Sequence, residues 1–175
     1  MGTTNVGGFQ ALCRQLPRLR KPRLMELLAD PSLPLLGWRE WAALPDLGLE
    51  PMLAKVDTGA RSCALHVDWQ HCFIEAGVER VEFLLTPMRA LAPVRAVAEV
   101  LARRPVTDSG GRTAERVFIR TRLRLGAWMR EVEVNLADRR GLRHAMLIGR
   151  SAIAAQWCVD PARSFVLGGA QDEPG

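Results

Sequence analysis

Long apolar runs are missing from this 175-residue chain, and charged residues stand near the N-terminus where a secretory signal needs an apolar stretch. A helix that crosses a bilayer needs roughly 20 apolar residues in succession. Cysteine is also scarce, and the four cysteines, Cys13, Cys63, Cys72 and Cys158, are spaced too irregularly for a secreted disulfide framework. We therefore expect reduced thiols, a cytoplasmic location and no membrane as partner.

Lysine is nearly absent, since Lys21 and Lys55 are the only two, and the formal net charge of +5 comes almost wholly from arginine. Arginine suits two-point hydrogen bonding to carboxylates. A genome that favours arginine codons would produce the same composition. The five tryptophans and five phenylalanines are not interleaved with the basic residues as a nucleic-acid stacking surface requires. Nucleic acid is therefore not an expected partner.

The composition, 48% hydrophobic and 25% charged, is ordinary for one globular domain with a sizeable core. Residues 1–33 are rich in proline and arginine and predict a basic, flexible N-terminal extension. This extension is either unstructured or a docking arm for an acidic partner. We expect the folded domain to cover residues 34–169 and a short flexible tail to cover residues 170–175.

Short apolar or alternating segments, separated by Gly, Pro or Asp turns, follow one another from residue 35 onward. They predict an all-β fold, a small closed β-barrel, with strands over residues 35–44, 51–56, 64–69, 80–85, 94–101, 116–125 and 128–136. The last two segments alternate cleanly on either side of Gly126 and Ala127. We expect them to form a hairpin whose opposed Arg and Glu side chains pair across the strands.

The most informative segment is residues 56–60, Val-Asp-Thr-Gly-Ala, at the end of an apolar run. A carboxylate at a strand-to-turn junction can act as acid or base on a water molecule, and Asp57 is the candidate. Thr58 can hydrogen-bond beneath this carboxylate. Gly59 allows a tight turn, and Ala60 keeps that turn narrow. Alone, Asp-Thr-Gly is a weak signal, because many turns use Asp and Gly.

A second segment, residues 145–153, reads Ala-Met-Leu-Ile-Gly-Arg-Ser-Ala-Ile and predicts an apolar strand followed by a short C-terminal helix. Asp-Thr-Gly-Ala followed about ninety residues later by Leu-Ile-Gly-Arg resembles the retropepsins, which are single-domain aspartic proteases that work as homodimers. The resemblance implies a retropepsin-like barrel with one aspartate turn per chain. It also implies that Gly149 and Arg150 pack behind that turn.

Further segments narrow this resemblance to a bacterial retropepsin-like family that carries the label "ATP-dependent zinc protease". They are residues 37–41 (Gly-Trp-Arg-Glu-Trp), 55–62 (Lys-Val-Asp-Thr-Gly-Ala-Arg-Ser), 64–66 (Ala-Leu-His), 138–139 (Asp-Arg) and 159–168 (Val-Asp-Pro-Ala-Arg-Ser-Phe-Val-Leu-Gly). The sequence nevertheless has no Walker-type phosphate loop and no His-Glu-x-x-His zinc helix. We therefore expect neither a metal nor any other cofactor.

In retropepsins a mobile flap closes over the substrate, and residues 106–112 are the corresponding glycine-tipped segment. Ser109, Gly110 and Gly111 are accordingly substrate-binding candidates, with a plain surface turn as the alternative. Arg150 lacks the acidic partner that it has in retroviral enzymes, so the sequence leaves its partner open.

Arg61 follows the aspartate turn directly, at a position where retroviral enzymes carry acidic residues. An arginine there would favour the ionised aspartates and could bind an acidic side chain of the substrate through two hydrogen bonds. The alternative is a structural ion pair with Asp68 or Glu40.

The resemblance implies a homodimeric aspartic endopeptidase in which two Asp57 carboxylates share one proton and activate water. Family members are often associated with ATP-grasp ligases that add glutamates to protein tails. Together with the arginine content, this predicts acidic or glutamate-rich peptides as substrates and a glutamate ligase as a partner.

Two alternatives remain. In the first, the same dimeric barrel acts without catalysis, as a binding or regulatory module for an acidic tail or a glutamate ligase. The weaker alternative is a zinc peptidase that uses Cys63, His66, His71 and Cys72, whose spacing matches no familiar zinc site.

Overall fold

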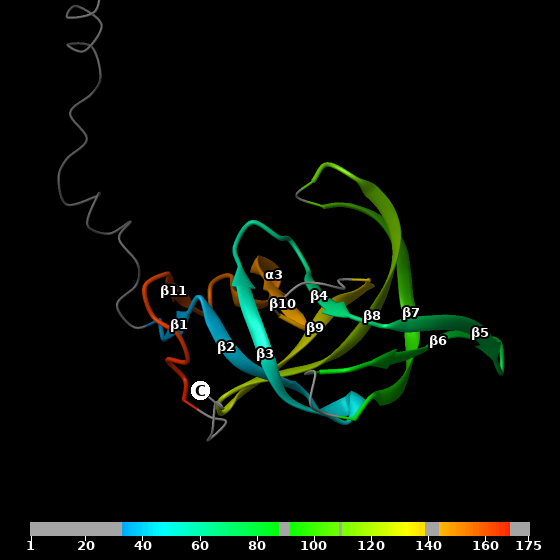
Figure 1. The fold of residues 1–175 in the computed structure, drawn as a ribbon, viewed down its shortest axis with the longest axis horizontal. Helices are drawn as coiled ribbons and strands as arrows, with labels where there is room; N and C mark the ends of the chain where they lie inside the picture. The colour runs from blue at the N-terminus through cyan, green and yellow to red at the C-terminus, as the bar shows by residue number, and fades with distance from the viewer. Residues whose placement is uncertain (1–32, 88–91, 109, 139–143, 169–175) are drawn as a thin grey trace, which may run out of the picture. The chain divides into compact units, whose positions relative to one another are not determined.

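The computed structural model describes residues 33–87, 92–108, 110–138 and 144–168 of the chain (Figure 1). The proposed extension up to residue 32, the tail at 170–175 and Ser109 lie outside these ranges. The elements are β1 (Leu35–Gly37), β2 (Arg39–Leu44), the 3-10 helix η1 (Pro45–Leu47), β3 (Leu49–Asp57), β4 (Cys63–His66), β5 (Trp69–Glu75), β6 (Val78–Leu85), β7 (Val94–Thr107), β8 (Thr113–Leu125), β9 (Trp128–Ala137), β10 (Met146–Gly149), α3 (Arg150–Ile153) and β11 (Cys158–Asp160). Among the described residues, none of the helices has the length and apolar character needed to span a bilayer.

Six strands close into a ring. The larger sheet has the order β2-β3-β10-β4-β9-β8-β7-β6-β5, and β8 also pairs with β2. That last pairing joins Ala42 to Leu125 and leaves β7, β6 and β5 as an extension of the closed barrel. Closure removes the free edges of the strands in the ring. The predicted all-β barrel and the short helix α3 are both confirmed.

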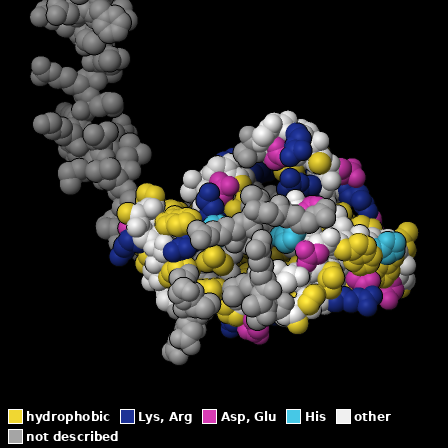
Figure 2. Space-filling model, viewed as in Figure 1, with side chains coloured by type: hydrophobic (Ala, Val, Ile, Leu, Met, Phe, Trp, Pro, Cys, Tyr) yellow, Lys and Arg dark blue, Asp and Glu magenta, His cyan; other side chains and the backbone are white. Residues whose placement is uncertain are grey.

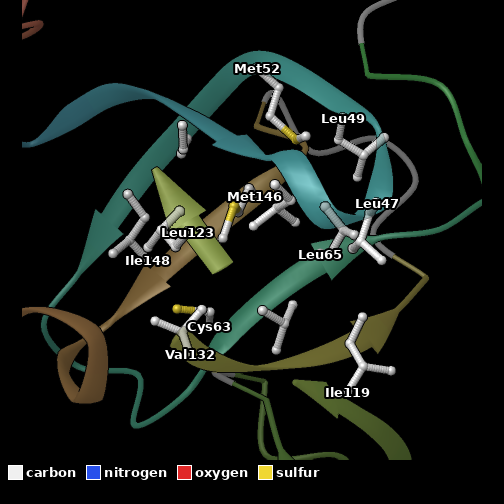
Figure 3. Close-up of a cluster of buried hydrophobic side chains, with 14 of the residues drawn as sticks. Leu47, Leu49, Met52, Cys63, Leu65, Ile119, Leu123, Val132, Met146 and Ile148 are labelled. Atoms are coloured by element: carbon white, nitrogen blue, oxygen red, sulfur yellow. The ribbon is translucent and has the colours of Figure 1, made fainter. Parts of the chain in front are cut away.

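The interior of the ring is filled by fully buried aliphatic side chains (Figure 3). Leu65 from β4, Met146 and Ile148 from β10 and Leu123 from β8 each expose no surface, and they meet there with Met52 from β3. These residues occupy alternate positions of their strands, because successive side chains of a strand point to opposite faces. The pattern that predicted the strands is therefore the pattern that builds the core.

Several predicted boundaries were wrong. The segment 35–44 divides at Trp38, because β1 pairs with β11 and β2 pairs with β3. The segment 64–69 ends at His66, and β5, which the sequence did not predict, starts at Trp69. Strand β7 continues to Thr107 through polar residues that alternate weakly, because β8 supplies a hydrogen-bonded partner along that length. Pairing with a distant segment decided each of these boundaries.

The hairpin of β8 and β9 is confirmed, with Leu125 opposite Trp128. Its predicted Arg–Glu pairing holds for Arg120 and Glu131, which lie 3.5 Å apart. The other expected pairs are replaced: Glu133 binds Arg104 of β7, and Arg122 binds Asp46 of η1. These partners come from neighbouring elements that the sequence pattern of one hairpin does not reveal.

Candidate active site

Asp57 is the last residue of β3, and its side chain is held by the turn that follows. Its Oδ1 accepts hydrogen bonds from the backbone N–H of Gly59 at 3.0 Å and of Ala60 at 3.2 Å. The carbonyl of Asp57 also accepts a hydrogen bond from Ala60 N–H. Within the described chain, Oδ2 makes no hydrogen bond. One carboxylate oxygen is therefore fixed in place while the other can reach a reacting group.

Thr58 does not make the predicted hydrogen bond beneath Asp57. Its side chain is exposed, and its hydroxyl has no partner among the described residues. The backbone N–H groups of Gly59 and Ala60 make the contacts to the carboxylate instead. An exposed hydroxyl beside the aspartate is open to contact from outside the chain.

Strand β10 and helix α3 support the aspartate turn from behind. Gly149 lies opposite Asp57 in the parallel pairing of β10 with β3. The backbone N–H of Arg150 donates to the carbonyl of Ala60 at 2.9 Å, and that of Ser151 donates to the carbonyl of Arg61 at 3.0 Å. A Cβ on Gly149 would lie 2.3 Å from the carbonyl oxygen of Ser62, so the approach requires glycine.

The structure supplies the partner of Arg150 that the sequence left open. Its guanidinium donates to the backbone carbonyls of Gly59 at 3.1 Å and of Thr58 at 3.4 Å. Backbone carbonyl oxygens thus take the place of the acidic side chain found in retroviral enzymes. Arg150 therefore stabilises the conformation of the turn that carries Asp57.

Arg61 does not form either of the alternative ion pairs. Glu40 is fully buried and accepts backbone N–H groups from Gly37, Val166 and Leu167. Asp68 binds His66 at 3.1 Å and the hydroxyl of Thr86 at 3.0 Å.

The exposed guanidinium of Arg61 acts electrostatically on Glu133 of β9. Among the described residues it makes no ion pair. Its charge is therefore available beside the aspartate turn.

The predicted flap, residues 106–112, falls where strand β7 turns into strand β8 in a long hairpin. Figure 1 shows its tip curving back over the end of the barrel that carries the β3–β4 turn. Asp108 Oδ1 accepts the backbone N–H groups of Gly110 at 2.9 Å and Arg112 at 3.0 Å. Gly111 is exposed with φ of 79°, a left-handed conformation that favours glycine. Asp108 thus stabilises the hairpin tip.

Four functional candidates escaped the sequence analysis: Arg104, Arg116, Glu133 and Asn135. They lie on β7, β8 and β9, next to the segment that follows the aspartate turn. Asn135 Nδ2 donates to the carbonyl of Cys63 at 2.6 Å, and it also reaches Ser62 Oγ at 3.3 Å. Their partners are 19 to 73 residues away in sequence, so no local motif marks them.

The described residues contain no group of three or more His, Cys, Asp or Glu side chains placed to hold a metal ion. Cys63 is fully buried, and desolvation raises the pKa of its thiol to about 11, although the N–H of Gly149 acts in the opposite direction. The uncharged thiol is a poor metal ligand. Cys63 instead packs in the barrel core with Val132 (Figure 3).

A family model described as "Retropepsin-like aspartic endopeptidase RimB" matches residues 35–169. The chain belongs to this family. The match covers the aspartate turn, the hairpin of β7 and β8, and the supporting strand β10.

Several curated proteins are similar to this RimB-like chain. A "Probable alpha-L-glutamate ligase" from Shewanella halifaxensis is 34% identical over 140 residues, which are 79% of this chain and 31% of that protein. A protein with the same description from Desulfotalea psychrophila is 32% identical over 141 residues, again 79% of this chain and 30% of its own length. The chain thus spans about a third of the length of these relatives.

A solved structure is also similar. It is the crystal structure of a Legionella pneumophila protein of unknown function, with a TM-score of 0.67 and 28% sequence identity. The likeness covers 78% of this chain and 99% of the other.

Proposed function

We propose that this chain is a homodimeric aspartic endopeptidase. The observation that carries the proposal is the position of Asp57 at the end of β3, with one oxygen held by two backbone N–H groups and the other unbound within the described chain. Membership of a family described as aspartic endopeptidases supports it.

Two copies of the chain would bring two Asp57 carboxylates together. Like charges at short separation cannot both ionise, so the pair holds one proton. The ionised carboxylate removes a proton from water as the water attacks the scissile carbonyl, while the protonated one donates a hydrogen bond to the carbonyl oxygen. A proton then passes to the leaving amine as the C–N bond breaks. This route needs neither a covalent enzyme intermediate nor a metal.

The proposed substrates are acidic or glutamate-rich peptides. The exposed Arg61 guanidinium beside the aspartate turn supports this choice, because guanidinium groups bind carboxylates through two parallel hydrogen bonds. The names of the longer relatives, probable alpha-L-glutamate ligases, are consistent with it. We further propose a glutamate ligase as a functional partner, acting in the cytoplasm.

The test is cleavage of a glutamate-rich peptide library by the full chain and by Asp57→Asn, with and without EDTA. We expect Asp57→Asn to lower kcat by at least about 10²- to 10⁴-fold, the usual contribution of a general acid–base group. EDTA should have no effect. Circular dichroism should show the same fold, because the asparagine oxygen can still accept from Gly59 and Ala60.

Asp46→Asn is the matched control, because Asp46 is an exposed carboxylate bound to Arg122 on the surface. It should leave turnover unchanged. Turnover that survives in Asp57→Asn but disappears with EDTA would contradict the proposal and favour a zinc peptidase. Tight peptide binding with no cleavage by the unaltered chain would favour a binding module.

A further inference from the structure

The buried side-chain amide of Asn135 connects the segment after the aspartate turn to strand β8 of the β7–β8 hairpin. Asn135 is 2% exposed, and its Nδ2 donates to the carbonyl of Cys63 and reaches Ser62 Oγ. Its Oδ1 accepts a hydrogen bond from Arg116 of β8 at 3.0 Å. This amide therefore fixes the guanidinium of Arg116 relative to the chain that leaves the active turn.

Glu133 makes a second connection on the same face of β9. Its carboxylate binds Arg104 of β7 at 2.5 Å. The hydrogen bond from Arg104 lowers the pKa of Glu133, partly opposed by desolvation, and the charges of Arg104, Arg120 and Arg61 lower it further. Arg104 also lies 4.7 Å from the ring centre of Phe118, which supports its guanidinium from below.

Arg104 and Arg116 face each other directly across β7 and β8. Two like charges at opposed positions destabilise a strand pair unless other groups compensate. Here Glu133 compensates Arg104, whereas the hydrogen-bond partner of Arg116 is the neutral amide of Asn135.

The cluster holds more positive than negative charge. Its four arginines are Arg61, Arg104, Arg116 and Arg120, and its two carboxylates are Glu131 and Glu133, which leaves an excess of two positive charges. Among the described residues, Arg61 and Arg116 have no carboxylate partner. Figure 2 shows Lys and Arg side chains gathered beneath the curled tip of the β7–β8 hairpin.

We propose that Arg61, Arg104 and Arg116 form a subsite for an acidic side chain of an extended peptide, and that Glu133 is an internal carboxylate that competes for Arg104. The inference rests on the proposed peptidase function and adds the residues that select the substrate. The incoming carboxylate binds the guanidinium of Arg116, which Asn135 holds in place, or that of Arg61, in the two-point manner typical of arginine. Arg104 and Arg116 lie on strands β7 and β8 rather than at the aspartate turn. The subsite therefore binds the side chain of a substrate residue that is away from the scissile bond.

Measuring peptide binding to a variant that lacks the Asp57 carboxylate tests this subsite independently of catalysis. Two fluorescein-labelled decapeptides, identical except that glutamines replace four glutamates in one, are titrated into full-length Asp57→Asn protein and followed by anisotropy. We expect the glutamate peptide to bind at least about tenfold more tightly, and Arg116→Gln or Arg104→Gln to remove most of that difference. Arg116→Lys, which keeps the charge but loses the two-point geometry, should give an intermediate value.

Glu133→Gln has the opposite expected effect. Removing the internal carboxylate should raise the affinity for the glutamate peptide about three- to tenfold while leaving that for the glutamine peptide unchanged. A residue with a purely structural role would produce no gain. Arg95→Gln is the matched control, because Arg95 is an arginine of the same strand β7 that pairs with Glu82 in another part of the sheet. It should alter neither affinity.

Equal binding of the two peptides, or equal weakening of both by the arginine variants, would overturn the subsite. If the arginine-dependent preference is present in Asp57→Asn but the unaltered chain cleaves neither peptide, the subsite stands and the peptidase proposal fails. If the unaltered chain cleaves both peptides with the same kcat/KM, the peptidase proposal stands and the subsite fails.

Discussion

Gly149 and Arg150 each lie in close contact with the backbone of the segment that follows Asp57. Gly149 lets β10 approach the backbone of Ser62, and Arg150 binds the carbonyls of Thr58 and Gly59. Neither residue has an atom that we place in the reaction. Both determine whether the aspartate turn has the shape that presents the free carboxylate oxygen.

Gly149→Ala should destabilise the fold, because the new Cβ would meet the Ser62 carbonyl oxygen at 2.3 Å. Forcing extra atoms into a packed site costs typically 1–3 kcal/mol, and we expect a loss of at least about 1 kcal/mol in the free energy of unfolding. Urea denaturation measures it. Ser151→Ala, an exposed position two residues along, should change stability by less than about 0.5 kcal/mol. Equal stability of Gly149→Ala and the unaltered chain would show that the turn can move away from β10.

At the scale of elements, a buried carboxylate joins the start of the domain to its end. Glu40 of β2 accepts N–H groups from Gly37 before it and from Val166 and Leu167 near the C-terminal end of the described chain. The ring of Phe165 stacks on Trp41 at 5.6 Å, and Arg39 lies over Phe165. Two of the segments that carry the family resemblance, residues 37–41 and 159–168, are therefore in contact although they are far apart in the sequence.

Glu40→Gln should lower the free energy of unfolding by about 1–3 kcal/mol, because one accepting oxygen becomes an NH₂ group that faces a backbone donor. Chemical denaturation at neutral pH gives the value. Glu50→Gln tests the same exchange at an exposed position of β3 and should have little effect. A Glu40→Gln protein as stable as the Glu50→Gln protein would mean that the three N–H groups find other partners.

At the scale of the whole described domain, a closed ring of six strands carries a single aspartate turn, the one that holds Asp57. A barrel with one aspartate turn cannot supply two facing carboxylates, so the proposed chemistry requires two copies of the chain. Thr58 and Gly59 beside Asp57 are exposed, so in the proposed dimer they are accessible to a second copy.

Specific activity should therefore fall on dilution, in parallel with the conversion of dimer to monomer. Sedimentation velocity gives the dimer fraction at each concentration, and initial rates give the activity. Mixing the unaltered chain with an excess of Asp57→Asn should suppress activity, because mixed dimers carry only one ionisable Asp57. Full specific activity in a solution that contains only monomer would refute the dimeric mechanism.

The sequence by itself determined the strand-rich architecture and singled out Asp57 as the candidate carboxylate. Both depend on local patterns: alternation along strands such as β8 and β9, and a short motif in which Asp57 precedes Gly59. The apolar strand before Gly149 and the helix after it were likewise predictable from nine adjacent residues.

Only the tertiary structure decided which distant side chains meet. Asn135 reaches Ser62 across 73 residues, and Arg104 reaches Glu133 across 29. The partner of Arg150 proved to be backbone carbonyls, which exist at every residue and leave no mark in a sequence. Hydrogen bonds and charges act over a few ångströms in space whatever the separation along the chain, so closure of the barrel had to bring these groups together before their roles were visible.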